Sequence, residues 1–455
     1  MRQTLFVIPA ELFGIPLFGF GLVLGLWALL TGAAAWVIYR RTGGAAEILR
    51  QLPVMLLVGA GIWLAPRVID VAGGLPVRGF GAMMLLAVCA AVGLAVYRAR
   101  QMRVDPEVVL SLAFWIFLPG IVGARLYYIA KNWRDFRRLD DEGSLDFTSS
   151  LAATLDVTEG GLVVYGAVIA GAVGYFAFVR RHRLPALALG DLIAPSLMFG
   201  LALGRVGCFL NGCCYGGVCD APWAVTFPEG QKLPGQEYAR LSPPYSAQME
   251  AGLIPHGVRL EDRGEGPPAI AEIVAGSPAA KSGLQQGDRV ARINGLAIES
   301  AEQARRALLQ LSSVDNEVVV LIAGSDAAKK WTVPAAPSRS LPVHPTQLYA
   351  ALDALLIGLF LLAYYPYRRR DGEVVAWLMT LYGAARLLEE SIRSDVPHVL
   401  RLGFVALNDP QVISLLVLSG GIVLFAYLWP KSRGSAFERS PGAGERWAWE
   451  LRSAA

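Results

Sequence analysis

Long apolar runs separated by short polar segments dominate the chain. Because a helix rises about 1.5 Å per residue, about 20 apolar residues cross the ~30 Å hydrocarbon core of a membrane. Nine runs reach or approach that length, which predicts an all-α polytopic membrane protein of about nine transmembrane helices. The expected spans are residues 13–39, 51–71, 79–97, 107–130, 160–179, 187–207, 347–367, 373–391 and 411–430.

Basic residues follow every second run and set the expected orientation. They are Arg40, Arg41 and Arg50; Arg98, Arg100 and Arg103; Arg180, Arg181 and Arg183; Arg368, Arg369 and Arg370; and Lys431 and Arg433. By the positive-inside rule these ends are cytoplasmic, with the N-terminus outside and the tail 431–455 inside. The loop 131–160 should then be external, although basic residues are interleaved with its acids. A cleaved signal peptide ending near Ala33–Ala35 is an alternative for the first run, but the Arg40-Arg41 stop favours an uncleaved span.

Residues 217–343 interrupt this pattern with a soluble composition. The expected elements are a short helix after the Ser277 N-cap, a strand over 288–295 ending in an Asn-Gly turn, a helix from a Ser300 capping box to Leu311, and a strand over 317–323. In this order they resemble a PDZ domain, expected as an α+β insertion on the extracytoplasmic side. Such a domain implies capture of an extended peptide by strand addition. A spacer without a ligand is the alternative.

The composition supports a membrane protein and argues against a nucleic-acid-binding one. Of 455 residues, 54% are hydrophobic and only 17% are charged, which is too apolar for a soluble chain of this size. The net charge is only +4, and the basic residues adjoin the apolar runs, so membrane topology explains them. No metal and no cofactor is expected.

Arginines recur near the same expected membrane depth. In the stated orientation, three outward-running spans carry one toward their outer ends: Arg125, Arg205 and Arg386. An arginine at mid-membrane costs about 2.5–3.5 kcal/mol, so three at one level predict an anion pocket. Guanidinium binds phosphate through two parallel hydrogen bonds, which favours a lipid phosphate as the ligand. Phe80, Tyr165 and residues 344–349 begin the inward-running spans at the same level.

One face of span 373–391 continues this polar pattern. Tyr382, Arg386, Glu390 and Arg393 fall at i, i+4, i+8 and i+11, which is a single helical face. An Arg386–Glu390 pair that only neutralises itself is the alternative. The two further arginines at this depth favour the anion pocket.

Four cysteines cluster after span 187–207, in the order Cys208-x4-Cys213-Cys214-x4-Cys219. Disulfides are one hypothesis, because the expected external compartment is oxidising. Packing alone is a second. A metal site is a third, although the spacing is not a standard zinc pattern. A cysteine nucleophile is the fourth.

Together these motifs resemble the prolipoprotein diacylglyceryl transferase family, over about residues 76–256 and 337–430 and seven of the nine spans. The resembling pieces are Phe80-Gly81; Gly123-Ala124-Arg125-Leu126; Tyr165-Gly166 with Gly171; Asp191 with Pro195; Gly204-Arg205-x-Gly207 through Asn211-Gly212 to Gly216; His344-Pro345-Thr346-Gln347-Leu348-Tyr349; and Tyr382-Gly383-x-x-Arg386-x-x-x-Glu390-x-x-Arg393. The resemblance divides the chain into an N-terminal extension (1–75), a first core part (76–256), the PDZ-like insertion (257–336), a second core part (337–430) and the tail.

The resemblance implies a reaction in the bacterial cytoplasmic (inner) membrane. A diacylglyceryl group passes from phosphatidylglycerol to the lipobox cysteine thiol beside a prolipoprotein signal peptide, and glycerol phosphate leaves. The implied catalytic residues are Arg205, Arg386, Tyr382, Tyr165 and Glu390; the implied substrate-binding residues are Arg125, Asn211, Gly216, His344, Gln347 and Arg393. Tyr165 stands where the family often has a histidine, Cys208 and Cys213 stand where it has an asparagine and an acid, and Phe80 replaces a tyrosine.

Two other functions fit the same residues. One is a divergent phosphatidylglycerol-dependent transferase with another acceptor. The other is a non-catalytic membrane scaffold that binds anionic lipid and uses its PDZ-like unit on envelope proteins.

Overall fold

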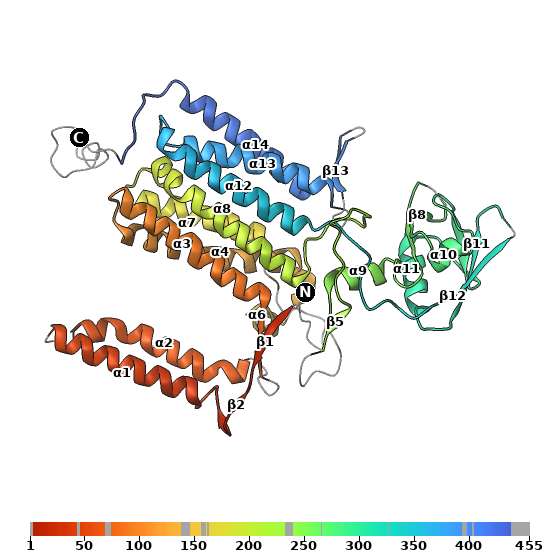
Figure 1. Cartoon of the computed structure of the whole chain (residues 1–455), viewed down its shortest axis with the longest axis horizontal. Coiled ribbons are helices and arrows are strands. Elements are labelled where there is room, and N and C mark those ends of the chain that lie inside the picture. The colour runs from red at the N-terminus through yellow and green to blue at the C-terminus, as the bar shows by residue number, and fades with distance from the viewer. Residues whose placement is uncertain are drawn as a thin grey trace.

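Nine long helices dominate the described part of the chain outside the PDZ-like unit, and each coincides with an expected span (Figure 1). The computed structural model describes residues 3–42, 46–68, 74–137, 146–155, 161, 163–232, 240–264, 266–325, 327–393, 398–402 and 405–437. The long helices are α1 (Leu22–Thr42), α2 (Ala46–Val68), α3 (Gly79–Gln101), α4 (Pro106–Lys131), α7 (Val164–Arg181), α8 (Ala186–Asn211), α12 (Thr346–Tyr364), α13 (Glu373–Ser391) and α14 (Asp409–Leu428).

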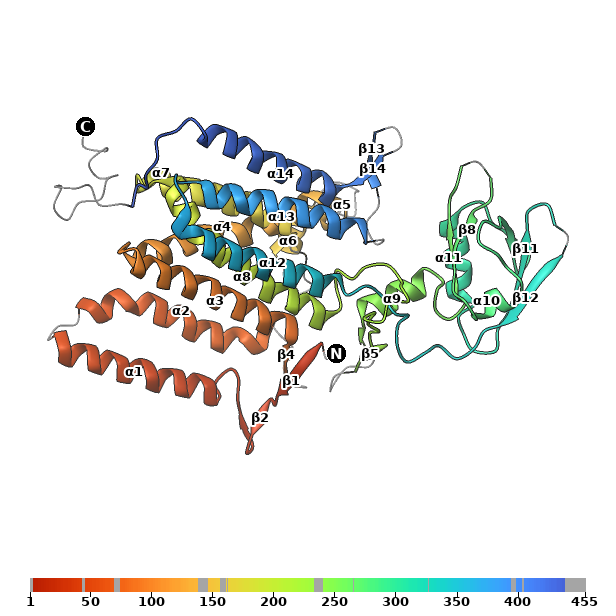
Figure 2. The ribbon, with the colours of Figure 1, turned by 45° about the horizontal axis from the view of Figure 1, so that its top comes forward.

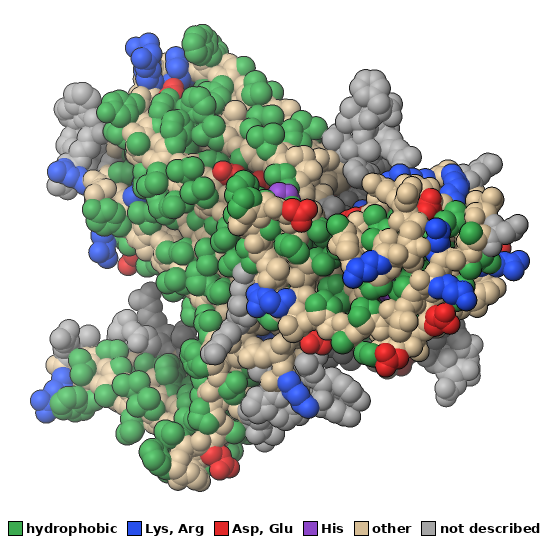
Figure 3. All heavy atoms as spheres, turned by 45° about the vertical axis from the view of Figure 1, so that its right-hand side comes forward, with side chains coloured by type: hydrophobic (Ala, Val, Ile, Leu, Met, Phe, Trp, Pro, Cys, Tyr) green, Lys and Arg blue, Asp and Glu red, His purple; other side chains and the backbone are tan. Residues whose placement is uncertain are grey.

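Six of these helices are long and apolar enough to cross a membrane: α1, α3, α4, α8, α12 and α14. Helix length and hydropathy in the described residues therefore support six of the nine expected spans. Apolar side chains cover the flanks of the helices, whereas charged side chains gather at the helix ends and on the PDZ-like unit (Figure 3). This distribution is that of a multi-pass membrane protein.

The first expected span begins too early. Residues 4–16 form short strands, and α1 starts only at Leu22, because Phe13, Gly14 and Gly19 adopt positive φ angles that a helix cannot contain. The strands are β1 (Thr4–Ile8), β2 (Glu11–Leu12) and β3 (Ile15–Pro16). Strand β1 pairs antiparallel with β4 (Leu75–Arg78). This pairing joins the α1–α2 hairpin to the start of α3, beside the main bundle (Figure 2).

Glycines allow the helices of the bundle to approach closely. A Cβ atom on Gly166 of α7 would lie 2.2 Å from the carbonyl oxygen of Gly123 in α4. A Cβ on Gly383 of α13 would lie 2.7 Å from the backbone nitrogen of Leu418 in α14. Small residues at such crossings are typical of membrane helices, whose association depends on close backbone packing. Helix α8 packs against α3, α12 and α13 and occupies the centre.

A buried polar cluster fixes the end of the bundle farthest from the PDZ-like unit. The carboxylate of Asp191 is fully buried and accepts from the backbone N–H groups of Gly372 (2.7 Å) and Val375 (2.9 Å), at the start of α13. The guanidinium groups of Arg98 and Arg368 stack on the ring of Tyr365 from 4.2 and 3.8 Å. The opposite end, where α8 and α13 finish and α12 starts, is called the PDZ-side end below.

The PDZ-like unit contains two small sheets and two helices. Strands β7 (Val258–Glu261) and β8 (Ala269–Ile273) form a pair, and the second sheet has the order β10-β9-β11-β12. The remaining bounds are β9 (Val290–Ile293), β10 (Leu296–Ala297), β11 (Glu317–Ile322), β12 (Ala328–Thr332), α10 (Pro278–Lys281) and α11 (Ala301–Gln310). Its core includes the fully buried Ile270, Ile293, Leu308 and Val318.

The local predictions for this unit are confirmed with one difference. Ser277 caps α10, and the turn after β9 places Asn294 and Gly295 at φ 45° and 84°. Ser300 caps α11 by accepting from the N–H of Gln303. The capping box is incomplete, however, because the Gln303 side chain accepts from the N–H of Glu299 instead of Ser300.

The other short elements connect the helices. They are α5 (Trp133–Phe136), α6 (Phe147–Leu155), β5 (Gly230–Gln231), β6 (Arg240–Leu241), α9 (Pro243–Glu250), a 3-10 turn (Tyr365–Tyr367), β13 (His398–Leu402) and β14 (Val405–Asn408). Helix α9 lies between the bundle and the PDZ-like unit (Figure 1). Most of the expected tail, residues 438–455, lies outside the described residues.

Candidate active site

The last turns of α13 hold a network of ion pairs around one buried carboxylate. Glu390 is 1% exposed, and its Oε2 lies 2.6 Å from Nη2 of Arg386 and 3.5 Å from Nη1 of Arg393. A second glutamate, Glu389, lies 3.1 Å from Nη1 of Arg386. Because a buried unpaired charge is costly, these contacts fix the Arg386 guanidinium in one place.

Helices α7 and α8 bring two further expected residues to this network. Arg205, on α8, interacts electrostatically with Tyr382 and Glu389 of α13. Tyr165, in the first turn of α7, interacts in the same way with Arg386 and Glu390. The structure therefore groups all five expected catalytic residues at the PDZ-side end, although they come from three helices.

The loop that follows α8 is held over this end by the start of α12. Gly212 ends the helix in a left-handed conformation, with φ 79°. The backbone oxygen of Cys213 accepts from Gln347 Nε2 at 2.8 Å, and that of Cys214 accepts from Thr346 Oγ1 at 2.7 Å. Gln347 is fully buried. Two anchored carbonyls give the loop one position.

Backbone pairing completes this attachment. Gly216 N–H donates to the oxygen of His344 at 2.9 Å, and His344 N–H donates to Gly217 at 3.0 Å. A Cβ on Gly216 would lie 2.8 Å from the Cβ of His344, so only glycine fits there. Gly217 N–H reaches the oxygen of Ile392, just after α13. The loop 212–217 thus joins the ends of α8, α12 and α13.

Three more of the expected substrate-binding residues have structural contacts of their own. The Arg125 guanidinium donates to the backbone oxygens of Thr154 (3.1 Å) and Gly161 (3.3 Å), and so holds the segment before α7. The imidazole Nδ1 of His344 lies 3.3 Å from the hydroxyl of Tyr349. Asn211, the last residue of α8, accepts from Gln3 Nε2 through its backbone oxygen at 3.2 Å.

Three of the clustered cysteines meet in the same region. The Sγ atoms of Cys208, Cys213 and Cys214 all lie within 4.8 Å of one another, as free thiols. Cys208 and Cys214 lie within electrostatic reach of Arg205. This grouping favours a shared role over independent packing. Thiols suit soft metals as well as disulfides, so both hypotheses stay open.

Two acidic residues of the network were absent from the sequence prediction. Glu389 stands at i+3 from Arg386, so the spacing rule that found Glu390 could have found it. Asp353, on α12, shares a hydrogen bond with Glu389. An acid within the apolar run of α12 was the available signal.

This arrangement defines a class of protein: a multi-pass membrane protein with arginines gathered for an anion at one end of its helices. The prolipoprotein diacylglyceryl transferase profile matches residues 66–263 and 311–427, and the PDZ domain profile matches residues 246–323. The chain therefore belongs to the prolipoprotein diacylglyceryl transferase family and carries a PDZ domain.

Individual relatives agree with this assignment. A phosphatidylglycerol–prolipoprotein diacylglyceryl transferase from Rhodopirellula baltica is 30% identical over 98% of this chain and 92% of its own. Relatives with the same name from Thermosynechococcus vestitus and Mycobacterium leprae are 32% and 36% identical. They match 36% and 35% of this chain, and 56% and 46% of their own length.

Proposed function

We propose that this protein transfers a diacylglyceryl group from phosphatidylglycerol to the lipobox cysteine of prolipoproteins and releases glycerol phosphate. Its family membership and the named relatives support this reaction. The observation that carries the proposal is that Glu389 interacts with both Arg386 and Arg205, while Glu390 holds Arg386 from a second side. A phosphate ester is the lipid group that such a pair binds best.

The arginines have a direct role in the chemistry. The acceptor sulfur attacks the glyceryl carbon that bears the phosphate, a C–S bond forms, and the C–O bond to the phosphate breaks. The leaving phosphate gains negative charge, which preorganised Arg205 and Arg386 stabilise more strongly than they stabilise the bound lipid. Glu390 keeps Arg386 and Arg393 oriented during this step.

The thiol must also lose its proton. A thiolate is the reactive form, and guanidinium groups close to the acceptor sulfur favour it. Tyr165 and Tyr382 place phenol groups within electrostatic reach of the arginines, where they orient the thiol or relay its proton. Asn211 and Gly216 shape the loop over the site, and Arg125, His344 and Gln347 keep the neighbouring segments in position.

The site lies at the extracytoplasmic side of a bacterial inner membrane, spanned by nine helices. The basic groups after α1, α3, α7 and α12 adjoin the ends opposite the PDZ-side end, and the positive-inside rule makes those ends cytoplasmic. The N-terminus and the PDZ domain are then external. Single cysteines introduced into the PDZ domain of a chain lacking its own cysteines should react with an impermeant maleimide in intact cells. Reaction only after lysis would contradict this orientation.

A purified assay tests the reaction itself. The protein in detergent is given phosphatidylglycerol and a lipobox peptide, and glycerol phosphate release is measured. Arg205→Ala and Arg386→Ala should each abolish release, whereas the matched control Arg306→Ala, on the exposed face of α11, should keep it. Normal release by both site variants would refute the site assignment. Restored palmitate labelling of a lipoprotein in a transferase-depleted strain provides the test in cells.

A further inference from the structure

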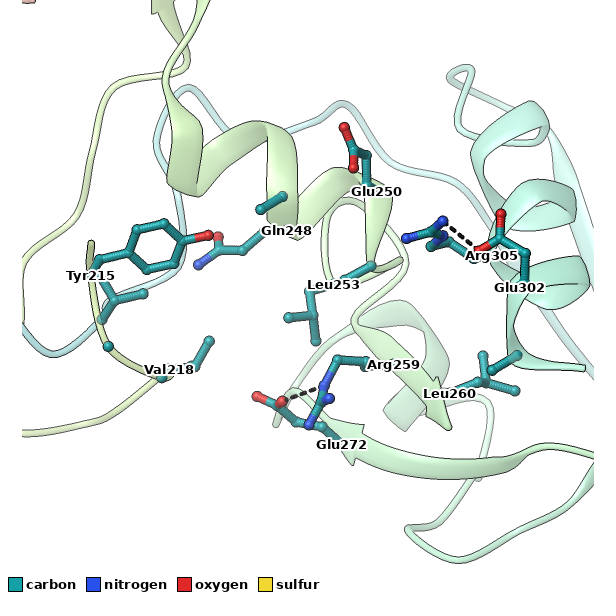
Figure 4. Close-up of a pocket in the computed structure, with 16 residues that line it drawn as sticks. Tyr215, Val218, Gln248, Glu250, Leu253, Arg259, Leu260, Glu272, Glu302 and Arg305 are labelled. Atoms are coloured by element: carbon teal, nitrogen blue, oxygen red, sulfur yellow. Dashed lines mark hydrogen bonds and ion pairs between the residues drawn. The ribbon is translucent and has the colours of Figure 1, made fainter. Parts of the chain in front are cut away.

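A cavity of about 420 Å³ lies where the PDZ domain meets the transferase core (Figure 4). One wall comes from the PDZ domain, with Arg259 and Leu260 of β7 and Glu302 and Arg305 of α11. The other comes from the core, with residues 215–218 after α8 and residues 247, 248, 250 and 251 at the end of α9. In Figure 4 Tyr215 and Gln248 face this space from the side opposite Arg305 and Glu302. The cavity is thus shared by the two units.

The PDZ wall suits an added strand. Among the described residues, β7 has β8 as its only strand partner. On its other edge, beside α11, the N–H of Val258 donates to the oxygen of Gly252, and the edge beyond Val258 is available. An extended peptide can join such an edge through main-chain hydrogen bonds. Glu272 and Arg259 form an ion pair at 3.1 Å, and Glu302 pairs with Arg305. These charges largely cancel, and the lining also contains Leu253, Leu260 and Val218, so the cavity fits a segment of low charge.

The loop before β7 is poorly suited to a C-terminal carboxylate. Such a group is bound by successive free backbone N–H groups. Here Leu253 and Ile254 donate theirs to the oxygen of Gln248, at 2.9 and 3.1 Å, and Gly257 donates to Gly252 and Leu253. Pro255 has no N–H at all. These hydrogen bonds favour a peptide segment that continues through the cavity over a peptide that ends in it.

The core wall leads toward the active site. Residues 215–218 directly continue the loop that Gln347 and Thr346 anchor over the ends of α8 and α13. On the proposed function, the substrate's signal helix occupies the membrane, so residues after the acceptor cysteine must leave at the PDZ-side end. The cavity lies on that side.

We propose that this shared cavity binds the segment of the prolipoprotein that directly follows the acceptor cysteine, as an extended strand added to β7. The inference rests on the proposed function. The PDZ domain then acts as a substrate-positioning unit, and it reads an internal segment of the same molecule whose thiol reacts.

Two peptides test this on the full-length protein in detergent with phosphatidylglycerol. The short peptide ends at the lipobox cysteine as an amide. The long one continues for roughly eight residues of low charge, about 26 Å when extended. We expect the long peptide to have a KM about tenfold lower, which corresponds to about 1.4 kcal/mol of binding, with kcat unchanged. Equal KM values would overturn the proposal.

Variants that fill the cavity give the matched comparison. Ala301→Trp blocks it from α11, and Ala247→Trp blocks it from α9, so the test survives if one variant fails to fold. Each should remove the advantage of the long peptide and leave kcat for the short one unchanged. Arg306→Trp, on the exposed side of α11, should keep the advantage. Retention of the advantage in both cavity variants would refute the assignment.

A direct measurement of peptide binding tests the cavity independently of the transfer reaction. Fluorescence anisotropy of labelled peptides should show the long peptide binding more tightly, equally as free acid and as amide. A requirement for the free carboxylate, or equal binding of long and short peptides, would overturn the cavity assignment even if transfer occurs. Absence of glycerol phosphate with either peptide would instead refute the transferase function.

Discussion

The close contact between α4 and α7 makes Gly166→Ala a sharp test of how the site is positioned. An added Cβ would lie 2.2 Å from the Gly123 oxygen and 2.6 Å from the Tyr127 Cβ, against the 3.4–4 Å of ordinary contact. The first of these atoms is backbone, so it cannot rotate away, and the helices must separate by about 1 Å. Overpacking of this kind costs about 1–3 kcal/mol. Tyr165, the preceding residue, would move relative to Arg386.

A displacement of about 1 Å at a reacting centre can cost about 10²-fold in rate, so kcat/KM for glycerol phosphate release should fall by that order. The unfolding midpoint should also fall. Gly93→Ala is the matched control, because a Cβ there, on the exposed face of α3, meets nothing within 4 Å. Its activity should be unchanged. Wild-type activity and an unfolding midpoint equal to that of Gly93→Ala would refute the reasoning.

Three further predictions follow from the site and the PDZ domain. Glu390→Gln removes the buried charge that Arg386 and Arg393 share, whereas Glu389 remains. We expect the free energy of unfolding, measured by chemical denaturation, to fall by about 3 kcal/mol. A fall of less than ~1 kcal/mol would show that Glu390 does not hold the two arginines. Burial lowers the pKa of His256, whose Nε2 contacts the Leu308 oxygen at 2.9 Å while Nδ1 accepts from Trp331, so the PDZ domain should lose stability as pH falls below about 6.5. Hydrogen exchange of β9 and β11, corrected for intrinsic rates, should show this loss, and His256→Gln should remove its pH dependence. Mild oxidation should form a disulfide between two of Cys208, Cys213 and Cys214. The disulfide would displace the loop over the site, so activity should fall and should return on reduction. Counting free thiols checks this prediction, and an unchanged count after oxidation would contradict it.

Local patterns in the sequence were enough to predict the long helices and part of the ion-pair network on α13. Period and length located every long helix, and the i, i+4 spacing placed Glu390 beside Arg386, as the 2.6 Å contact shows. The Ser277 cap and the Asn294-Gly295 turn formed as expected because they depend on neighbouring residues alone. The start of α1 was misplaced, because an apolar run does not reveal that β1 pairs with a strand about seventy residues away.

The sequence by itself determined that the chain is a helical membrane protein, which residues carry charge into it, and where a soluble domain interrupts it. These follow from hydropathy and short-range spacing, which need no knowledge of the partner segments. Only the tertiary structure decided that Asp353 joins Glu389, that three thiols meet beside Arg205, and that the PDZ groove opens onto the loop after α8. Those arrangements depend on how closely glycine-lined helices cross and on contacts between residues far apart in the chain, and no local pattern encodes them.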